Sequence, residues 1–409
     1  MISCVHSEKD RKEAESLLDE LDELTQNLGI GVVGRRVIRI RKTSPRFILG
    51  KGKVEEILSE LKDSNVDVLI FDNEISPAQQ RNWETESKVL VIDRHEIILD
   101  VFAERAQTKE AKLQVKLARL EYSLPRLRRA WTHLSRQRGG GVTQRGEGEA
   151  QIELDQRMVR DQIAATRREI LQVSKQRQTG RTRRQRLPLP SVAIVGYTNA
   201  GKSTLLNQLT GADAVSEDKL FATLDPTSRR LKLPSGRIIV LTDTVGFIRK
   251  LPHRLVDSFK ATLEEALVAD LIIHLVDLSS AEYEAQMETT DRVLKELGAI
   301  ENPLLTVYNK IDQIPDDIEK IRAKRISDQP IFISAQTTEG IPSLLNRLEE
   351  IFSSKSEECD YMIPLSRYDL VARLKAQGNL IEEETTKTGF QIKAYPQGEL
   401  EHSLKEFKK

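Results

Sequence analysis

The chain has 409 residues, a length that favours two to four domains. Its formal net charge is zero, which excludes a uniformly acidic or basic polyelectrolyte, although 31% of the residues are charged. The two cysteines, Cys4 and Cys359, match no metal-binding or redox spacing. No apolar run approaches the roughly 18–20 residues of a membrane span, and no signal-like segment precedes residue 30. We expect a cytoplasmic, monomeric protein without a membrane span.

The first 103 residues alternate between helix and strand patterns. The expected elements are helices within residues 8–28, 54–61 and 78–86, and strands within residues 32–40, 66–71 and 89–92. The last two strands are short apolar runs of the kind buried in parallel sheets. This alternation predicts a small N-terminal α/β domain over residues 1–103. The stretch Gly50–Lys53 lacks the full phosphate-binding pattern, so a turn before a helix is favoured over a phosphate contact.

Residues 104–186 have a different composition. Leucines and one tryptophan form a heptad seam at Leu113, Leu117, Leu120, Leu124, Leu127, Trp131 and Leu134. A second seam contains Ile152, Val159, Ile163, Ile170 and Val173, with polar Gln156 and Thr166 in register. The glycine-rich residues 138–149 between them are not expected to be helical. The pattern predicts an antiparallel helical hairpin, its first arm kinked at Pro125.

This hairpin is strongly basic, with 21 Lys and Arg against nine Asp and Glu, a local net charge of about +12. Arginines dominate and cluster at Arg126, Arg128, Arg129, Arg136 and Arg138, and again over residues 181–186. A charged coiled coil is often only a solvated surface. Because arginine suits bidentate phosphate contacts and base stacking, we favour binding to RNA, whose irregular clefts admit a narrow tip.

The segment Gly196–Ser203 reads G-x-x-x-x-G-K-S and follows an apolar strand pattern at Ser191–Val195. A helix is expected from Thr204 to Thr210. In this motif the glycines let the backbone wrap around phosphates, and the helix N-terminus favours negative charge. Lys202 can reach the β- and γ-phosphates, and the Ser203 hydroxyl can bind Mg²⁺. The motif predicts a nucleoside triphosphate site.

Further motifs follow the strand patterns downstream and identify the base. Asp243–Gly246 reads D-x-x-G, whose aspartate can hold Mg²⁺ through water and whose glycine N–H can meet the γ-phosphate. Asn309–Asp312 reads N-K-x-D. A buried carboxylate at Asp312 accepts two hydrogen bonds from guanine, and adenine has neither donor. We expect Lys310 to pack over the base and Asn309 to tie its loop to the phosphate loop.

The last of these strands, within residues 331–333, leads to Ser334-Ala335-Gln336, where the Ala335 N–H can meet the guanine O6. Between the phosphate loop and D-x-x-G, a first switch must supply a threonine for Mg²⁺ and the γ-phosphate. Thr223 and Thr227 both fit this role by spacing. Motifs in this order predict a Ras-like, phosphate-loop GTPase domain over residues 187–355.

Several stretches resemble the HflX family of translational GTPases. They are Thr223–Thr227 (Thr-Leu-Asp-Pro-Thr), Asp243–Phe247, Asp93–Ala103, Gln114–Ala118, Leu124–Leu127 and the glycine-rich Arg145–Glu149. The resemblance spans most of residues 30–352. The family usually has proline where this chain has Glu147, so the charge of the tip differs from the family pattern.

The resemblance implies that Thr223 is the Mg²⁺ ligand of the first switch, beside Ser203. It also implies binding to the large ribosomal subunit, a hairpin tip directed toward the peptidyl-transferase region, and splitting of stalled or idle ribosomes into subunits. The alternatives are a GTP-dependent RNA-binding switch and a ribosome-assembly GTPase.

The expected catalytic residues are Lys202, Thr223 and Gly246. The full set expected to contact GTP or GDP is Gly196, Tyr197, Thr198, Asn199, Ala200, Gly201, Lys202, Ser203, Phe221, Ala222, Thr223, Leu224, Asp225, Asp243, Thr244, Val245, Gly246, Asn309, Lys310, Ile311, Asp312, Ser334, Ala335 and Gln336.

Water activation is the missing function in this set. Phe247 stands where Ras-like enzymes place a water-orienting glutamine, so we expect slow turnover that a partner accelerates. Asn199 resembles the asparagine of K⁺-dependent GTPases, which gives K⁺ as a second candidate cofactor; the alternative is a hydrogen bond within the loop. Residues 356–409 combine strand and helix patterns and predict a small α+β domain without chemistry of its own.

Overall fold

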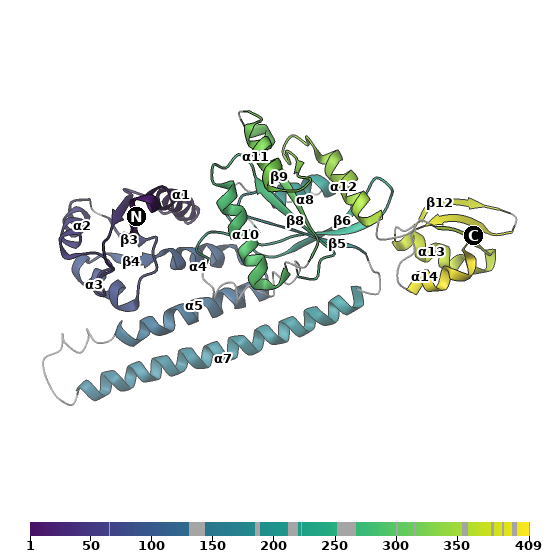
Figure 1. Ribbon diagram of the computed structural model, residues 1–409. Helices are drawn as coiled ribbons and strands as arrows, with labels where there is room; N and C mark the ends of the chain where they lie inside the picture. The colour runs from purple at the N-terminus through teal and green to yellow at the C-terminus, as the bar shows by residue number, and fades with distance from the viewer. Residues whose placement is uncertain are drawn as a thin grey trace. The chain divides into compact units, whose positions relative to one another are not determined.

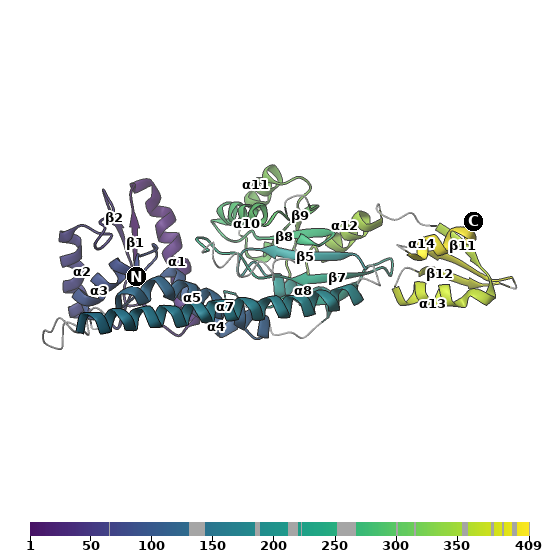
Figure 2. The same cartoon turned by 90° about the horizontal axis from the view of Figure 1, so that it is seen from below.

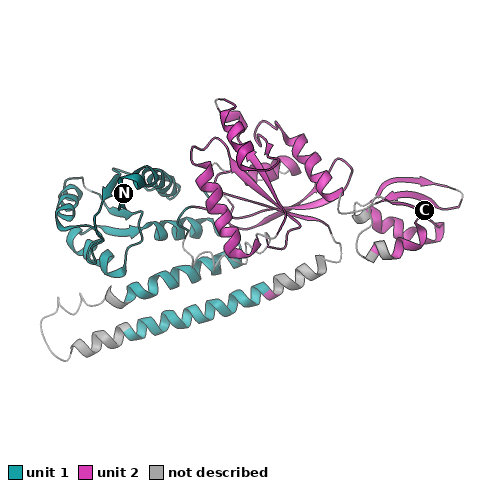
Figure 3. Cartoon of the chain, viewed as in Figure 1, with its two compact units in different colours: residues 1–174, 219–221, 249–259 teal, residues 175–218, 222–248, 260–409 magenta. Residues whose placement is uncertain are grey.

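The computed structural model describes residues 1–64, 66–130, 144–184, 189–211, 220–221, 223–251, 267–299, 302–314, 316–353, 359–377, 380–386, 388–394 and 399–408. Side chains are described for these residues except 128–130, 144–152, 176–184, 376–377, 399 and 401–402. The chain forms two compact units (Figure 3). The first comprises residues 1–174, 219–221 and 249–259, and the second comprises residues 175–218, 222–248 and 260–409. Within the described residues, no helix is both long and apolar enough to cross a bilayer.

The first unit begins as an α/β domain (Figure 1). Its elements are β1 (Ile2–Val5), α1 (Arg11–Asn27), β2 (Arg36–Arg39), α2 (Lys51–Ser64), β3 (Val68–Phe71), α3 (Pro77–Ser87), β4 (Leu90–Asp93) and α4 (Arg94–Arg105), with a short 3₁₀ turn at Glu8–Asp10. The strands pair in the order β2-β1-β3-β4, all parallel. The predicted α/β character is confirmed, but the sequence analysis missed β1, and α4 was known there only as a family motif.

Local signals explain these elements. Ser76 caps α3 by accepting from the Gln79 backbone N–H, while the Gln79 side chain accepts from the Ser76 N–H, and Pro77 occupies the first helical position. Trp83 on α3 is fully buried against Phe71 and Phe47, and its indole N–H donates to the Phe47 carbonyl. The sheet therefore shares one apolar core with α2 and α3.

Two long helices, α5 (Lys109–Ala130) and α7 (Gln144–Arg184), lie side by side, as Figures 1 and 2 show. An ion pair of 2.6 Å between Arg167 and Glu121 joins them. The predicted seams are buried or half-buried where their side chains are described, including the polar Gln156 and Thr166. The predicted hairpin arms are therefore confirmed. The tip residues 131–143, with Trp131, Leu134, Arg136 and Arg138, lie outside the described residues.

Two predictions about this hairpin were wrong. α7 begins at Gln144, so the glycine-rich Arg145–Glu149 is helical; two glycines, at about 1 kcal/mol each, are tolerated within a 41-residue helix. Arg126 is not free for RNA. Its guanidinium lies 3.4 Å from the Tyr122 ring centroid and donates to Gln80 (2.9 Å), the Ile75 carbonyl (3.2 Å) and Asp93 (3.3 Å). α5 continues through Pro125 to Ala130.

The second unit contains a larger sheet. Its elements are β5 (Ser191–Gly196), α8 (Lys202–Thr210), β6 (Thr227–Lys232), β7 (Ile238–Asp243), β8 (Leu271–Asp277), α10 (Tyr283–Leu297), β9 (Leu304–Asn309), α11 (Ile318–Ile326), β10 (Ile331–Phe332) and α12 (Ile341–Ser353), with a 3₁₀ turn at Ile311–Gln313. The strand order is β10-β9-β8-β5-β7-β6, and only β6 runs antiparallel to its neighbour. The four predicted strand-end motifs follow β5, β7, β9 and β10, which are parallel. Because parallel strands end at one edge of a sheet, these motifs meet there.

The C-terminal part of the chain forms a three-stranded antiparallel sheet with its own apolar core. Its elements are β11 (Cys359–Ile363), a 3₁₀ turn (Leu365–Arg367), α13 (Tyr368–Gln377), β12 (Leu380–Thr385), β13 (Phe390–Ala394), α14 (Glu399–Leu404) and a 3₁₀ turn (Lys405–Phe407). The predicted α+β character is confirmed. The four domain boundaries given by the sequence analysis stay predictions.

Candidate nucleotide-binding site

The phosphate loop connects β5 to α8, as predicted. Gly201 has a left-handed backbone with φ of 91°, and a Cβ there would lie 2.3 Å from Nδ2 of Asn309. A side chain at this position would therefore displace the Asn309 side-chain amide, besides being strained by the left-handed backbone. The Asn309 amide donates to the Ala200 carbonyl (2.9 Å) and accepts from the Ala335 N–H (2.9 Å). Asn309 therefore ties the phosphate loop to both base-recognition segments.

Lys202 is buried at the start of α8, and its ammonium donates to the carbonyls of Tyr197 (2.6 Å) and Gly196 (3.3 Å). Burial lowers the pKa of Lys202 to about 8, although the nearby Asp243 carboxylate acts in the opposite direction. A buried ammonium without a direct carboxylate partner favours an anion beside it, as a phosphate chain would supply.

Three oxygen-bearing side chains converge next to this lysine. The Ser203 hydroxyl lies 2.7 Å from Oδ2 of Asp243 and 2.7 Å from the Thr223 hydroxyl, which donates to the same carboxylate oxygen at 2.8 Å. Oδ1 of Asp243 is buried without a partner among the described atoms, and burial raises the pKa of this carboxyl. Hard oxygen donors of this kind suit Mg²⁺, so the residues fit the ion. Among described residues there is no cluster of three His, Cys, Asp or Glu side chains for a different metal.

The D-x-x-G segment lies against the phosphate loop. A Cβ on Gly246 would come within 2.9 Å of both the Lys202 ammonium and the Thr198 Cα, so only glycine fits. The Phe247 backbone N–H donates to the Gly196 carbonyl (3.1 Å), and its carbonyl accepts from the Thr198 N–H (2.8 Å). The Phe247 side chain is buried, with 1% exposure. It therefore has no means of orienting a water molecule.

The base-recognition segments meet at the ends of β9 and β10. Lys310, in a left-handed backbone with φ of 62°, forms an ion pair of 2.8 Å with Asp277 at the end of β8. The sequence analysis missed Asp277, although an aspartate ending an apolar strand run was a usable signal. The Asp277 carboxylate also accepts from the backbone and hydroxyl of Ser279. Asp277 therefore fixes the lysine expected to cover the base.

Asp312 is exposed rather than buried, so its ability to discriminate between bases depends on being covered by the base itself. The Ser334 backbone N–H donates to the Glu339 carbonyl (2.9 Å), and the Ser334 hydroxyl accepts from the Thr337 N–H (3.0 Å). These bonds hold the turn that presents Ala335. Ile311 is buried and Gln336 is exposed.

The side chains of several predicted contact residues have contacts of their own, and their contacts with the nucleotide stay predictions. Phe221 packs its ring on Phe102 of α4 instead. The Thr244 hydroxyl donates to the Ile194 carbonyl (2.8 Å), and the Val245 and Leu224 side chains are buried. Ala222 lies outside the described residues.

Asn199 is exposed with φ of 60°, and its side chain has no hydrogen-bond partner among the described residues. The alternative explanation for this residue, a bond within the loop, is therefore not seen in this part of the chain. Asp225 is half-buried.

A phosphate loop followed by D-x-x-G and N-K-x-D at neighbouring strand ends defines the phosphate-loop GTPases, and this chain is a GTPase. Three family descriptions match it in order: GTP-binding GTPase N-terminal over residues 15–103, GTP-binding GTPase middle region over residues 105–184, and 50S ribosome-binding GTPase over residues 191–310.

Curated relatives match nearly the whole chain. The GTPase HflX of Akkermansia muciniphila is 44% identical, covering 96% of this chain and 93% of its own length. The GTPase HflX of Escherichia coli K12 is 42% identical, covering 85% of this chain and 82% of its own length. The chain belongs to the HflX family of GTPases. Among solved structures, a GTP-binding protein from Sulfolobus solfataricus in complex with GDP is 24% identical, with a TM-score of 0.43, covering 87% of this chain and all of that one.

Proposed function

We propose that this GTPase binds the large ribosomal subunit and splits stalled or idle ribosomes into subunits, with GTP hydrolysis controlling release. The observation that carries the proposal is the combination of a complete GTP site with a long helical hairpin of net charge about +12. A basic rod supplies affinity for rRNA phosphates, and a nucleotide site supplies timing. This role requires the protein to act in the cytoplasm, and we expect it to act as a monomer.

Each site residue has a role in this scheme. Lys202 and the loop N–H groups neutralise the β- and γ-phosphates, and the Ser203 and Thr223 hydroxyls, with Asp243 beside them, would hold Mg²⁺. Mg²⁺ supplies neutralisation of the phosphate charge. The Gly246 N–H meets the γ-phosphate. Asp312 reads the guanine edge, with the Ala335 N–H on O6 and Lys310 over the ring.

The same geometry argues for slow intrinsic turnover. The described residues that line D-x-x-G include the buried Phe247, and its backbone is already bonded to the phosphate loop. Water therefore has to be positioned by something outside this segment. We propose that the ribosome supplies it. K⁺ near Asn199 is a second source of charge stabilisation, and equal turnover in KCl and NaCl would remove it from the scheme.

Sedimentation of purified ribosomes tests the function. With GTP, the protein should convert whole ribosomes to subunits, and a nonhydrolysable GTP analogue should trap it on the large subunit. Binding without dissociation would favour the RNA-binding switch, and binding only to immature subunits would favour the assembly role.

Two double variants distinguish ribosome binding through the hairpin from a general effect of positive surface charge. Replacing Arg128 and Arg129 by Gln should weaken ribosome binding and flatten its salt dependence. The matched control replaces Arg229 and Arg230 by Gln; both are exposed on β6, and the variant removes the same charge. Equal loss of binding in both pairs would contradict a specific role for the hairpin.

A further inference from the structure

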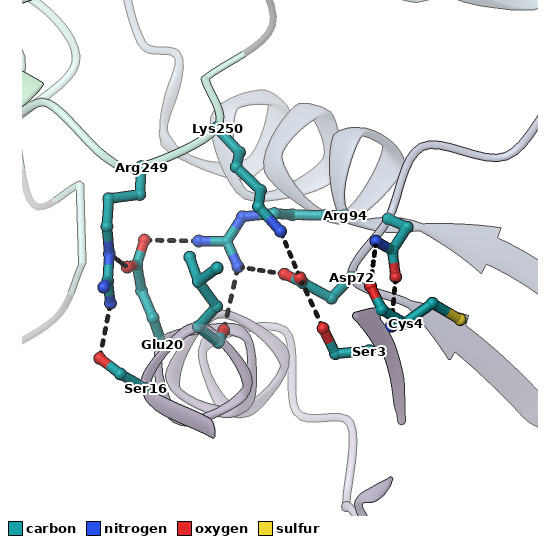
Figure 4. Close-up of polar contacts among 10 residues, drawn as sticks. Ser3, Cys4, Ser16, Glu20, Asp72, Arg94, Arg249 and Lys250 are labelled. Atoms are coloured by element: carbon teal, nitrogen blue, oxygen red, sulfur yellow. Dashed lines mark hydrogen bonds and ion pairs between the residues drawn. The ribbon is translucent and has the colours of Figure 1, made fainter. Parts of the chain in front are cut away.

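A buried ionic cluster lies in the first unit (Figure 4). At its centre is Arg94, the first residue of α4, whose side chain is 1% exposed. Its guanidinium donates to Glu20 of α1 (2.5 Å) and to Asp72 after β3 (3.0 Å). Both carboxylates are buried, with side-chain exposures of 8% and 0%. The GTP site as described does not use this cluster.

Two further cations reach the same carboxylates from a distant part of the sequence. Arg249 donates to Glu20 (3.1 Å) and to the Ser16 hydroxyl (2.8 Å), and Lys250 pairs with Asp72 at 2.6 Å. The Arg249 side chain is only 10% exposed. Residues 249–259 belong to the first unit, whereas residues 222–248 belong to the second. These contacts therefore begin three residues after Gly246.

A second contact within the first unit lies just before Thr223, the threonine expected to sense the γ-phosphate. The ring of Phe221, two residues before Thr223, packs edge-to-face on Phe102 of α4, with centroids 4.5 Å apart and an interplanar angle of 78°. Both rings are buried. Residues 219–221 also belong to the first unit. Each segment of the GTP site that senses the γ-phosphate thus has an adjacent contact in the first unit.

The backbone at these contacts is strained. Phe221 has φ of 56° and Lys250 has φ of 55°, a left-handed conformation that long or aromatic side chains rarely adopt. Such conformations persist where surrounding contacts hold them, and they concentrate at functional and switch segments. The strain therefore indicates that both contacts are firmly held.

Chain length limits what the attached segments can do. An extended residue spans at most about 3.6 Å, so the two to three residues separating each contact from Thr223 or Gly246 leave little slack. With both contacts made, Thr223 already lies against Ser203 and Asp243, where Mg²⁺ ligands must converge. The contacts of Phe221, Arg249 and Lys250 are therefore present together with the placement of Thr223 that GTP and Mg²⁺ require.

We propose that Phe102, Glu20 and Asp72 hold Phe221, Arg249 and Lys250 as positioning residues for Thr223 and Gly246, and that the first unit thereby favours GTP over GDP. The proposal rests on the γ-phosphate-sensing roles proposed above for Thr223 and Gly246. Because GDP has no γ-phosphate, loss of the contacts acts on GTP binding alone. By linkage, GTP also stabilises these contacts.

The test uses the full-length chain with Arg249 and Lys250 both changed to Ala. Dissociation constants for GDP and a nonhydrolysable GTP analogue are measured with Mg²⁺ by fluorescence titration. We expect a weakening of about fivefold or more for the analogue, the lower range of allosteric coupling, and less than about twofold for GDP. Equal weakening of both nucleotides, or no change for either, would overturn the proposal.

Further variants distinguish loss of the ion pairs from general damage to the fold. The pair Arg249→Lys with Lys250→Arg should restore analogue binding, and Glu20→Gln should reproduce the loss without changing shape. Arg229→Ala with Arg230→Ala removes equal charge on β6 and should change neither nucleotide. A conservative pair as impaired as the alanine pair would contradict a role for the ion pairs.

Thr223→Ala distinguishes failure of the premise from failure of the inference. If Thr223→Ala leaves the preference for the analogue over GDP unchanged, the proposed role of Thr223 fails. If it reduces that preference and the Arg249/Lys250 variant does not, only the positioning proposal fails.

Discussion

Two buried polar clusters in this chain have opposite character. In the phosphate site, Asp243 shares one oxygen with Ser203 and Thr223, its other oxygen has no partner among the described atoms, and the Lys202 ammonium donates only to carbonyls. In the first unit, every charged group around Arg94 has an opposite charge within 3.1 Å. Both clusters are similarly enclosed, so burial alone does not separate them.

The difference teaches how to tell a ligand site from a structural cluster. Unpaired buried charge is costly and is kept where a ligand completes it, whereas a paired cluster is complete without one. Substitutions in the phosphate site should therefore weaken binding of GDP and GTP alike, whereas loss of Arg94 should lower stability and leave GDP binding almost unchanged.

Lys202→Ala should have the largest effect on binding. Removing the buried cation should weaken binding of a GTP analogue by more than about a hundredfold, in line with the loss of one strong charge-stabilising donor. The thermal unfolding temperature without nucleotide should not fall, because no carboxylate among the described residues forms a direct ion pair with this lysine. Calorimetric titration and thermal unfolding measure both, with Lys232→Ala on exposed β6 as control. A large loss of stability without loss of binding would contradict the claim that Lys202 serves the ligand rather than the fold.

Arg94→Met should show the opposite behaviour. It leaves two buried carboxylates around a missing charge, and breaking such a pair costs about 3–5 kcal/mol of unfolding free energy. The GDP dissociation constant should stay within about twofold, because the described partners of Arg94 are Leu17, Glu20 and Asp72, none of them a predicted nucleotide contact. Urea unfolding measures the first quantity. Arg11→Met removes two exposed ion pairs and should change the unfolding free energy far less than Arg94→Met does. A similar cost for both variants would show that the cluster is not stabilising.

His274 on β8 is a buried titratable group that should make the stability of the fold depend on pH. Burial, and secondly the charge of Lys202, lower the pKa of His274 to about 4, while Asp291 lies 3.7 Å from its Nδ1. Below pH 6.5 the His274 imidazole binds a proton in the unfolded chain but stays neutral in the folded chain. The free energy of unfolding therefore falls as the pH drops from 6.5 to about 4. The loss is on the order of 3 kcal/mol by pH 4.

The free energy of unfolding is measured at pH 7 and pH 5 in wild type and His274→Phe. The transition to follow is the one whose midpoint shifts when GDP is added. The variant should lose stability less steeply on acidification, whatever its absolute stability. Identical pH dependence in both proteins would show that His274 is protonated in the fold.

The sequence predicted the phosphate site well because its motifs are local. Each of Lys202, Asp243, Asn309 and Asp312 follows an apolar strand run at a fixed spacing, and the parallel sheet then gathers the strand ends. Roles that depend on distant partners could not be predicted. Glu20 lies among other acids on α1 that read as a solvated face, and nothing near Arg249 in the sequence points to it. The prediction for Arg126 was wrong for the same reason, because its partners come from α3, the segment just before α3 and the end of β4.

GTP turnover with and without purified large ribosomal subunits tests the central claim most directly, namely that this site binds GTP but hydrolyses it slowly until a partner orients the attacking water. Phe247 is buried and apolar, so the isolated protein should hydrolyse GTP slowly, and large subunits should raise kcat by about a hundredfold or more, on the order of what one positioned group contributes. Small subunits at the same concentration should have no effect. Fast turnover by the isolated protein, or equal stimulation by both subunits, would contradict the account.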